Sequence, residues 1–120
     1  MKEEIIVVTT NYVPGMKVTK LLGPTFGLVV RSRGIGGNFV AGLRSLVGGE
    51  INEYTRMLAD AREDAIKRLV NHAKEMGANA VIGMGFDSAD LGQIMTEIVA
   101  YGTAVVVEKE KKGAAPVTLR

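Results

Sequence analysis

The stretch NEYTRMLADAREDAIKRLVNHAKEM, residues 52–76, followed by Gly77, decides the fold. Apolar side chains recur along it at the spacing of one helix face, at Tyr54, Leu58, Ala61, Ala65, Leu69, Ala73 and Met76. Acidic residues crowd its first half and basic residues its second, which complements the helix dipole. Gly77 is placed to end the helix in a left-handed cap. We predict a long helix whose alanine-rich face lets the layer beneath it approach closely.

Segments typical of β-strands precede this helix. Residues 5–10 (IIVVTT) are rich in β-branched side chains and predict a short strand that is buried on both faces. Residues 16–31 predict a long second strand. It should bend or bulge at Gly23-Pro24, because proline cannot donate a hydrogen bond to a β-ladder.

A glycine-rich loop, residues 31–38 (RSRGIGGN), follows that strand. Apolar residues at helical spacing then predict a short first helix, with Asn38 as its N-cap and Gly48-Gly49 as its end. The bare glycine amides, the helix N-terminus and two arginines make this loop a candidate anion site.

Two further strands follow the long helix. Over residues 79–87 the side chains alternate, which places Ile82, Met84 and Phe86 together on one face. A polar hairpin at 88–92 leads into a long strand at 94–109 that is apolar on both faces. The predicted fold is therefore α+β, in the order β-β-α-α-β-β, with a mainly antiparallel sheet packed on one long helix.

Composition bounds the class of protein. With 120 residues, 47% of them hydrophobic and 23% charged, the chain predicts one globular domain. We place this domain at residues 1–110 and a frayed tail at 111–120. The acidic start and the lack of a long apolar run predict a cytoplasmic protein without a membrane anchor. A net charge of +2 and few aromatic residues argue against nucleic-acid binding.

Four motifs together resemble the YbjQ-like family: GNFVAGLRSLVGG at 37–49, Tyr54-x3-Leu58-x2-Ala61-Arg62-x2-Ala65, GANAVIG at 77–83 and YGTAV at 101–105. The resemblance implies a small α+β subunit that assembles into a homopentameric ring, and it brings a heavy-metal-binding label but no established reaction. Glu50 departs from the family pattern, which usually has a basic residue there. We expect structural roles for Tyr54 and Arg62.

The metal label has little support in the residue types. Soft metals prefer thiolate, imidazole or thioether ligands, whereas the chain has no cysteine, one histidine and six methionines. His72 has no second ligand at four-residue spacing. We therefore predict no metal ligands and no cofactor within one subunit. A ring axis that gathers one residue from each copy is the only route to a metal site.

The charge pattern supplies the candidate site residues. No acid occurs between Ile5 and Gly49, and the candidate anion-binding or partner-binding residues of this basic half are Arg31, Arg33, Gly36, Gly37, Asn38 and Arg44. The candidate interface acids are Glu50, Glu53 and Glu97. Either the loop binds a small anion, or it docks on the acidic front of another subunit's long helix, where Asp60, Glu63 and Asp64 also lie.

The sequence thus predicts a non-enzymatic, ring-forming protein that binds a small ligand, an ion or a partner at a site between subunits. The alternative is an enzyme acting on a small anionic substrate, with an intersubunit active site built from the same arginines and acids. We assign no catalytic residue, because general acid–base work needs a positioned partner and the spacing places none beside Glu97.

Overall fold

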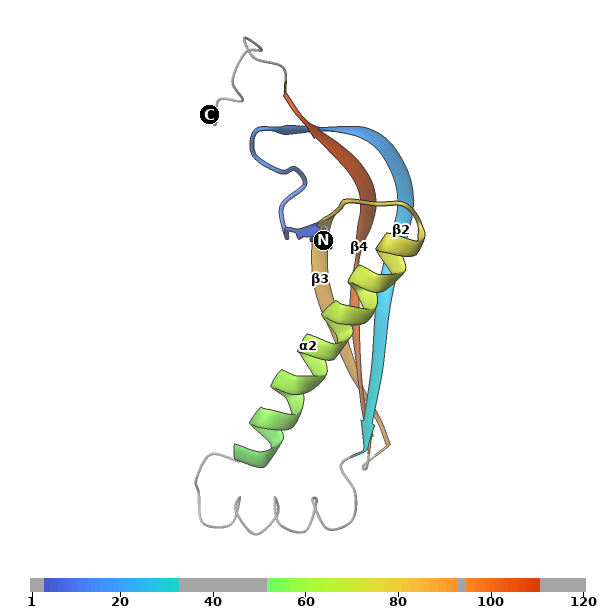
Figure 1. The fold of residues 1–120 in the computed structure, drawn as a ribbon. Coiled ribbons are helices and arrows are strands. Elements are labelled where there is room, and N and C mark those ends of the chain that lie inside the picture. The colour runs from blue at the N-terminus through green and yellow to red at the C-terminus, as the bar shows by residue number, and fades with distance from the viewer. Residues whose placement is uncertain (1–3, 33–51, 93–94, 111–120) are drawn as a thin grey trace.

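The computed structural model describes residues 4–32, 52–92 and 95–110. Its elements are β1 (Ile6–Val7), β2 (Met16–Ser32), α2 (Asn52–Glu75), β3 (Ala80–Leu91) and β4 (Met95–Lys109). The strands form one sheet in the order β1-β3-β4-β2, and α2 lies across one of its faces (Figure 1). The predicted α+β class is confirmed. The predicted first helix lies outside the described residues.

The sheet is mixed rather than mainly antiparallel. The two long pairings, β3 with β4 and β4 with β2, are antiparallel, but β1 pairs with β3 in parallel. Ile6 stands opposite Ala80 and Val7 opposite Val81. A parallel pair needs a long crossover connection, and here β2 and α2 both lie between the two strands along the chain.

The first strand is shorter and less buried than the sequence predicts. Only Ile6–Val7 forms a strand, and its side chains are half-buried because β1 is an edge of the sheet. The backbone beyond it still bonds to β3. The Val8 amide donates to the Val81 carbonyl at 2.9 Å, and the Gly83 amide donates to the Thr10 carbonyl at 2.7 Å.

The predicted bend in the long second strand is confirmed, although the strand does not break. Its register against β4 shifts between Val18 and Lys20 and again between Leu21 and Gly23. Gly23 has a φ of 122°, which side chains rarely tolerate, and Pro24 continues the ladder opposite Thr103. The strand curves over this stretch in Figure 1.

The predicted shared face of β3 is wrong for Ile82. The register against β4 shifts between Ile82 and Gly85, and Gly83 takes a φ of 64°. This bulge puts Met84 and Phe86 against the core beneath α2, while Ile82 packs against a second cluster. The pairing also runs further than predicted, to Leu91 opposite Met95, so most of the predicted hairpin is strand.

The helix is confirmed almost to the residue. Its stripe is fully buried at Ala61, Ala65, Leu69 and Ala73. The predicted close approach is also observed, because a Cβ on Gly27 of β2 would overlap the Ala65 carbonyl oxygen. Two bonds close the C-terminus around Gly77, whose φ is 93°. Its amide donates to the Lys74 carbonyl and the Ala78 amide donates to the Ala73 carbonyl, each at 3.0 Å.

A second, smaller cluster lies on the other face of the sheet. Its buried members are Val13, Ala80, Val105 and Val107, with Ile6, Val8, Met16 and Ile82 packed against them. The segment that joins β1 to β2 therefore covers one end of this face. Among the described residues, no helix is long and apolar enough to cross a membrane.

Candidate functional site

The rest of that second face carries large apolar side chains that stand in the open. We call this surface the open face and define it by Phe26, Leu28, Val30 and Tyr101, which are 52%, 46%, 45% and 42% exposed. They are neighbours across two strands, because Phe26 stands opposite Tyr101 in the ladder of β2 and β4. A contiguous apolar surface of this kind usually marks an interface.

Glu97, a predicted interface acid, lies on the same face. Its partners across the sheet are Val30 on one side and Ala89 on the other, and its side chain is half-buried. The carboxylate makes no hydrogen bond or ion pair with another described residue. Its assignment to an interface therefore stays a prediction.

The outer edge of β2 adjoins the open face. β2 is an edge strand of the sheet, and within the described residues it pairs with β4 alone. One of its carbonyls is occupied, since the Arg68 guanidinium donates to the Leu28 oxygen at 2.6 Å. A strand of 17 residues with one unpaired side is a natural place for another chain to add.

Arg31 has an acidic partner, but the partner belongs to the same chain. Its guanidinium donates to the carboxylate of Asp64 on α2, and the two side chains are about equally exposed. One of the two hypotheses from the sequence pairs these charge clusters between subunits, and the other has the basic loop bind a small anion. Within the subunit, Arg31 already has a carboxylate ligand.

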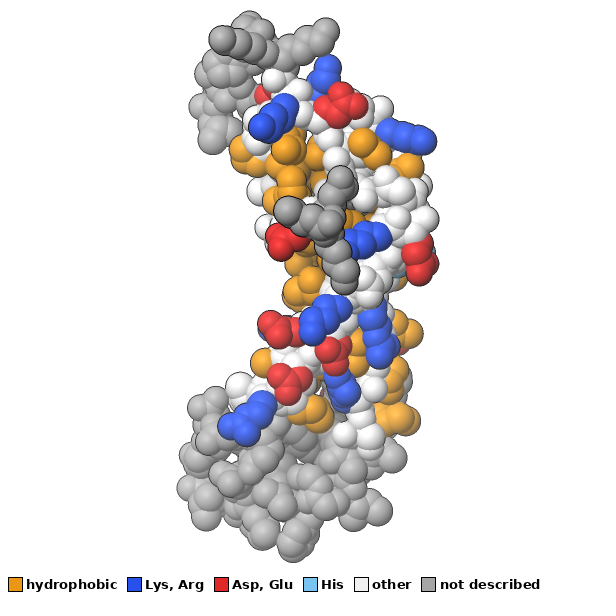
Figure 2. Space-filling model, in the orientation of Figure 1, with side chains coloured by type: hydrophobic (Ala, Val, Ile, Leu, Met, Phe, Trp, Pro, Cys, Tyr) orange, Lys and Arg blue, Asp and Glu red, His pale blue; other side chains and the backbone are white. Residues whose placement is uncertain are grey.

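The structure describes two of the other candidate residues of the charge pattern, Glu97 on β4 and Glu53. Glu53 lies in the first turn of α2. Six of them lie outside the described residues, namely Arg33, Gly36, Gly37, Asn38, Arg44 and Glu50. The anion-site and docking hypotheses for the loop therefore both stay predictions. Along the side of the molecule that carries α2, Figure 2 shows basic and acidic side chains interleaved.

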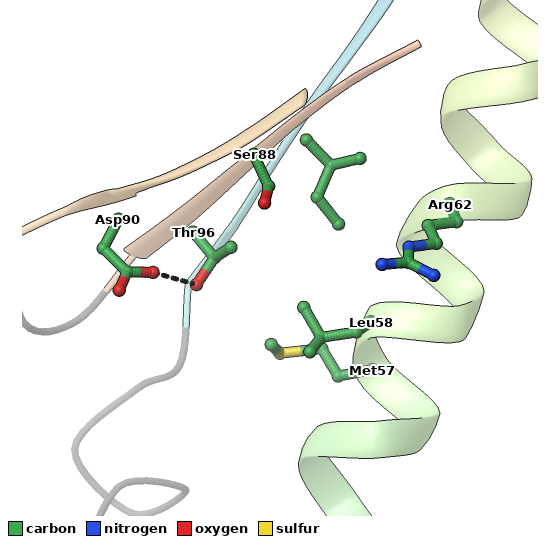
Figure 3. Close-up of a pocket in the computed structure, with 7 residues that line it drawn as sticks. Met57, Leu58, Arg62, Ser88, Asp90 and Thr96 are labelled. Atoms are coloured by element: carbon green, nitrogen blue, oxygen red, sulfur yellow. Dashed lines mark hydrogen bonds between the residues drawn. The ribbon is translucent and has the colours of Figure 1, made fainter. Parts of the chain in front are cut away.

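Sequence reasoning missed a cleft between the first turns of α2 and the far ends of β3 and β4. The cleft has a volume of about 300 Å³. Its lining residues are Met57, Leu58, Arg62, Ser88, Asp90, Thr96 and Ile98 (Figure 3). The sequence held one sign of this cleft, Arg62, which is part of a family motif. We had predicted a structural role for it. We call this site the α2 cleft.

The cleft exists because α2 diverges from the sheet toward its N-terminus. The helix stripe is completely buried at Ala61, Ala65, Leu69 and Ala73, but Leu58, one turn before Ala61, is 36% exposed. On the sheet side, Ile98 is nearly fully buried and Ser88 stands opposite it in the ladder. The cleft therefore has apolar side chains at its base, Leu58 and Ile98, and polar side chains such as Ser88 around its opening.

Charged groups of opposite sign line the two sides of the α2 cleft. The Arg62 guanidinium lies over the Phe86 ring, 5.6 Å from the ring centroid. Among the described residues no carboxylate pairs with it. On the strand side, the Thr96 hydroxyl donates to a carboxylate oxygen of Asp90 at 3.3 Å.

The single histidine is engaged in a structural contact. Thr25 is completely buried on β2, and its hydroxyl donates to the Leu69 carbonyl at 3.0 Å. His72 Nδ1 lies 3.0 Å from the same hydroxyl oxygen. Across the part of the chain that the structure describes, no three histidine, cysteine, aspartate or glutamate residues gather as a metal site would require.

Comparison with known proteins relates the chain to proteins of undefined activity. A family model described as "Putative heavy-metal-binding" matches residues 5–108. A "UPF0145 protein" from Methanoregula boonei is 62% identical over 119 residues, covering 99% of each chain. A second, from Thermoplasma volcanium, is 64% identical over 110 residues, covering 90% of each.

One solved structure shares the fold at low identity. It is a crystal structure of a protein of unknown function, of the DUF74 family, from Pediococcus pentosaceus. The TM-score is 0.63 at 12% identity, and the match covers 87% of this chain and 98% of that one. At this identity the likeness concerns the fold alone.

Proposed function

This chain belongs to the YbjQ family, and from that premise we propose that it is a non-enzymatic protein that assembles with copies of itself and binds a small ligand, an ion or a partner between its subunits. The resemblance indicated by its motifs is confirmed by the family match over residues 5–108. The family description names no reaction, so the proposal rests on surfaces rather than on catalytic groups.

The open face carries the proposal. It presents Phe26, Leu28, Val30 and Tyr101 to water on a sheet whose other face packs against the buried stripe of α2. Each Å² of apolar surface withdrawn from water is worth about 25 cal/mol, so covering these side chains would favour association strongly. A second copy of the chain is the partner that the family resemblance supplies.

The unpaired edge of β2 supports a ring over a simple pair. An edge and a face are different surfaces of one subunit, so a contact between the edge of one copy and the face of the next is heterologous. Heterologous contacts form a ring when the rotation from copy to copy closes. The number of subunits, five, comes from the family resemblance.

Glu97 would orient the copies. Covering the open face withdraws its carboxylate from water, and a buried carboxylate is tolerated when a cation or hydrogen-bond donor meets it. Since Val30 and Ala89 flank it within the sheet and no described residue pairs with it, we expect the covering chain to supply that donor. A requirement of this kind fixes register more than it adds affinity.

The test is the assembled mass of a charge variant. Leu28→Glu places a carboxylate at the centre of the open face, and we expect it to give monomers by native mass spectrometry while circular dichroism stays that of the wild type. Asn71→Glu adds the same charge on the exposed side of α2 and should assemble normally. An unchanged mass for Leu28→Glu would refute the open face as the interface.

Metal binding is tested separately. We expect zinc, copper or cadmium to show no tight stoichiometric binding, because the sequence lacks cysteine and the ring of His72 contacts Thr25. Isothermal calorimetry of the full chain measures this directly. Submicromolar binding that disappears in His72→Ala would contradict the expectation and place a site on α2.

A further inference from the structure

We propose that the α2 cleft binds a small monocarboxylate with an apolar body. All of its described lining residues belong to one chain, from α2, β3 and β4. The cleft is a different place from the site between subunits proposed above, and the inference goes beyond that proposal.

Arg62 supplies the recognition of the carboxylate. A guanidinium is a planar fork of N–H donors that matches the two oxygens of a carboxylate. The Phe86 ring supports the flat side of this group at 5.6 Å, which leaves the N–H edge available. Figure 3 shows the side chain extending from α2 toward the strands. Since no carboxylate among the described residues pairs with it, none of them would compete with an incoming one for its donors.

The walls of the cleft select the rest of the ligand. Met57, Leu58 and Ile98 form an apolar surface between the helix and the sheet. The volume of about 300 Å³ is at the small end of ligand pockets, which span roughly 300 to 1,000 Å³. A short branched or unbranched hydrocarbon chain fits both the size of the cleft and its apolar wall.

Asp90 sets the limit on charge. Its carboxylate lies on the strand side of the cleft and accepts the Thr96 hydroxyl. A ligand with two negative charges would meet Arg62 at one end and an acid of the same sign as itself at the other. The site should therefore discriminate against dicarboxylates and inorganic phosphate.

The experiment compares matched probes on the full-length wild-type protein. The probes are 4-methylpentanoate, its neutral isostere 4-methylpentanamide, the dianion glutarate, and inorganic phosphate, each titrated by ligand-observed NMR. We expect 4-methylpentanoate to bind at least about tenfold more tightly than the amide, since a hydrogen bond between two charged groups is stronger than one to a neutral group. Glutarate and phosphate should bind more weakly than 4-methylpentanoate.

Two variants assign the binding to this cleft. Arg62→Gln should weaken 4-methylpentanoate binding about tenfold or more and leave amide binding nearly unchanged. Arg56→Gln removes the same charge from another exposed arginine of α2 that is not among the residues lining the cleft, and it should bind like the wild type. Circular dichroism confirms that both variants fold.

Three results would overturn the proposal: no saturable binding of 4-methylpentanoate, equal affinity for the acid and the amide, or full affinity in Arg62→Gln. Preference for phosphate over the monocarboxylate would also overturn it, because the ligand class would then be wrong. The probe comparison needs no variant, so a folding defect in Arg62→Gln leaves the test intact.

Discussion

The two faces of the ladder between β2 and β4 differ in the size of the side chains they carry. The face under α2 carries Gly27 opposite Ala100, with the fully buried Ala65 above them. The open face carries Phe26 opposite Tyr101, and both are about half exposed. Small residues let the helix backbone rest almost on the strand, so that face is complete within one chain. The large residues of the other face have no such cover.

Side-chain burial also changes with position along the side of β4 that includes the open face. Val105 and Val107 lie on the same side of this strand as Tyr101 and are buried by the segment around Val13, whereas Tyr101 is 42% exposed. The chain therefore covers one end of this face with its own N-terminal segment, while no described segment covers the other end. The uncovered end is the surface that we propose a second copy covers.

The largest effect is expected where the helix touches the sheet. Gly27→Ala should destabilise the fold by about 3 kcal/mol, because its new Cβ would overlap the Ala65 carbonyl oxygen and stand 2.5 Å from the Leu69 nitrogen. Backbone atoms cannot move aside without shifting α2. Denaturant unfolding at fixed protein concentration measures the loss.

Gly85→Ala is the matched control on the open face, where the new Cβ would lie next to Tyr101. The three atoms nearest its Cβ all belong to the Tyr101 side chain, with the hydroxyl oxygen at 2.8 Å, and the end of a side chain can shift where backbone cannot. We expect a loss below about 1 kcal/mol. Equal losses at the two glycines would contradict the distinction between a closed face and an open one.

An intermediate effect is expected at the buried hydroxyl of the closed face. Thr25→Val keeps the side-chain shape but removes the hydroxyl that contacts the Leu69 carbonyl and His72 Nδ1. The loss should be about 1 kcal/mol, the usual net worth of a hydrogen bond. Thr19→Val, whose hydroxyl makes an exposed bond of 3.3 Å to the Val106 carbonyl, should unfold within a few tenths of a kcal/mol of the wild type.

The smallest effect is expected at the ion pair of Arg31 and Asp64. Both side chains are more than one-third exposed, so a double-mutant cycle with alanine should give a coupling below about 1 kcal/mol that shrinks at high salt. Because the partner lies in the same chain, Arg31→Ala should leave the assembled mass unchanged. If Arg31→Ala were a monomer, Arg31 would have to contribute to the contact between subunits.

Local patterns predicted the elements that local chemistry controls. The helix followed from a long stripe of apolar residues and the cap at Gly77, and the bend of β2 followed from Gly23-Pro24. Ile82 was assigned to the wrong face because Gly83, at positive φ, shifts the alternation of side chains by one residue. The alternating pattern of the sequence does not indicate this bulge.

The partners across the sheet and the α2 cleft needed the tertiary structure. The parallel pairing of Ile6 with Ala80 joins residues on either side of β2 and α2, and no spacing in the sequence encodes it. The cleft depends on where α2 leaves the sheet, between Leu58 and Ala61. Arg31 lies 33 residues from Asp64, so its charge alone did not identify a partner in the same chain.

The most direct test of the central claim is the mass of the wild-type protein in solution. Light scattering coupled to size exclusion, at micromolar concentration, measures it without any label or variant. We predict a single species that is a multiple of the 12.8 kDa chain, five copies on the family resemblance. A mass of 12.8 kDa would contradict the proposal, because the open face would then remain uncovered in a stable monomer.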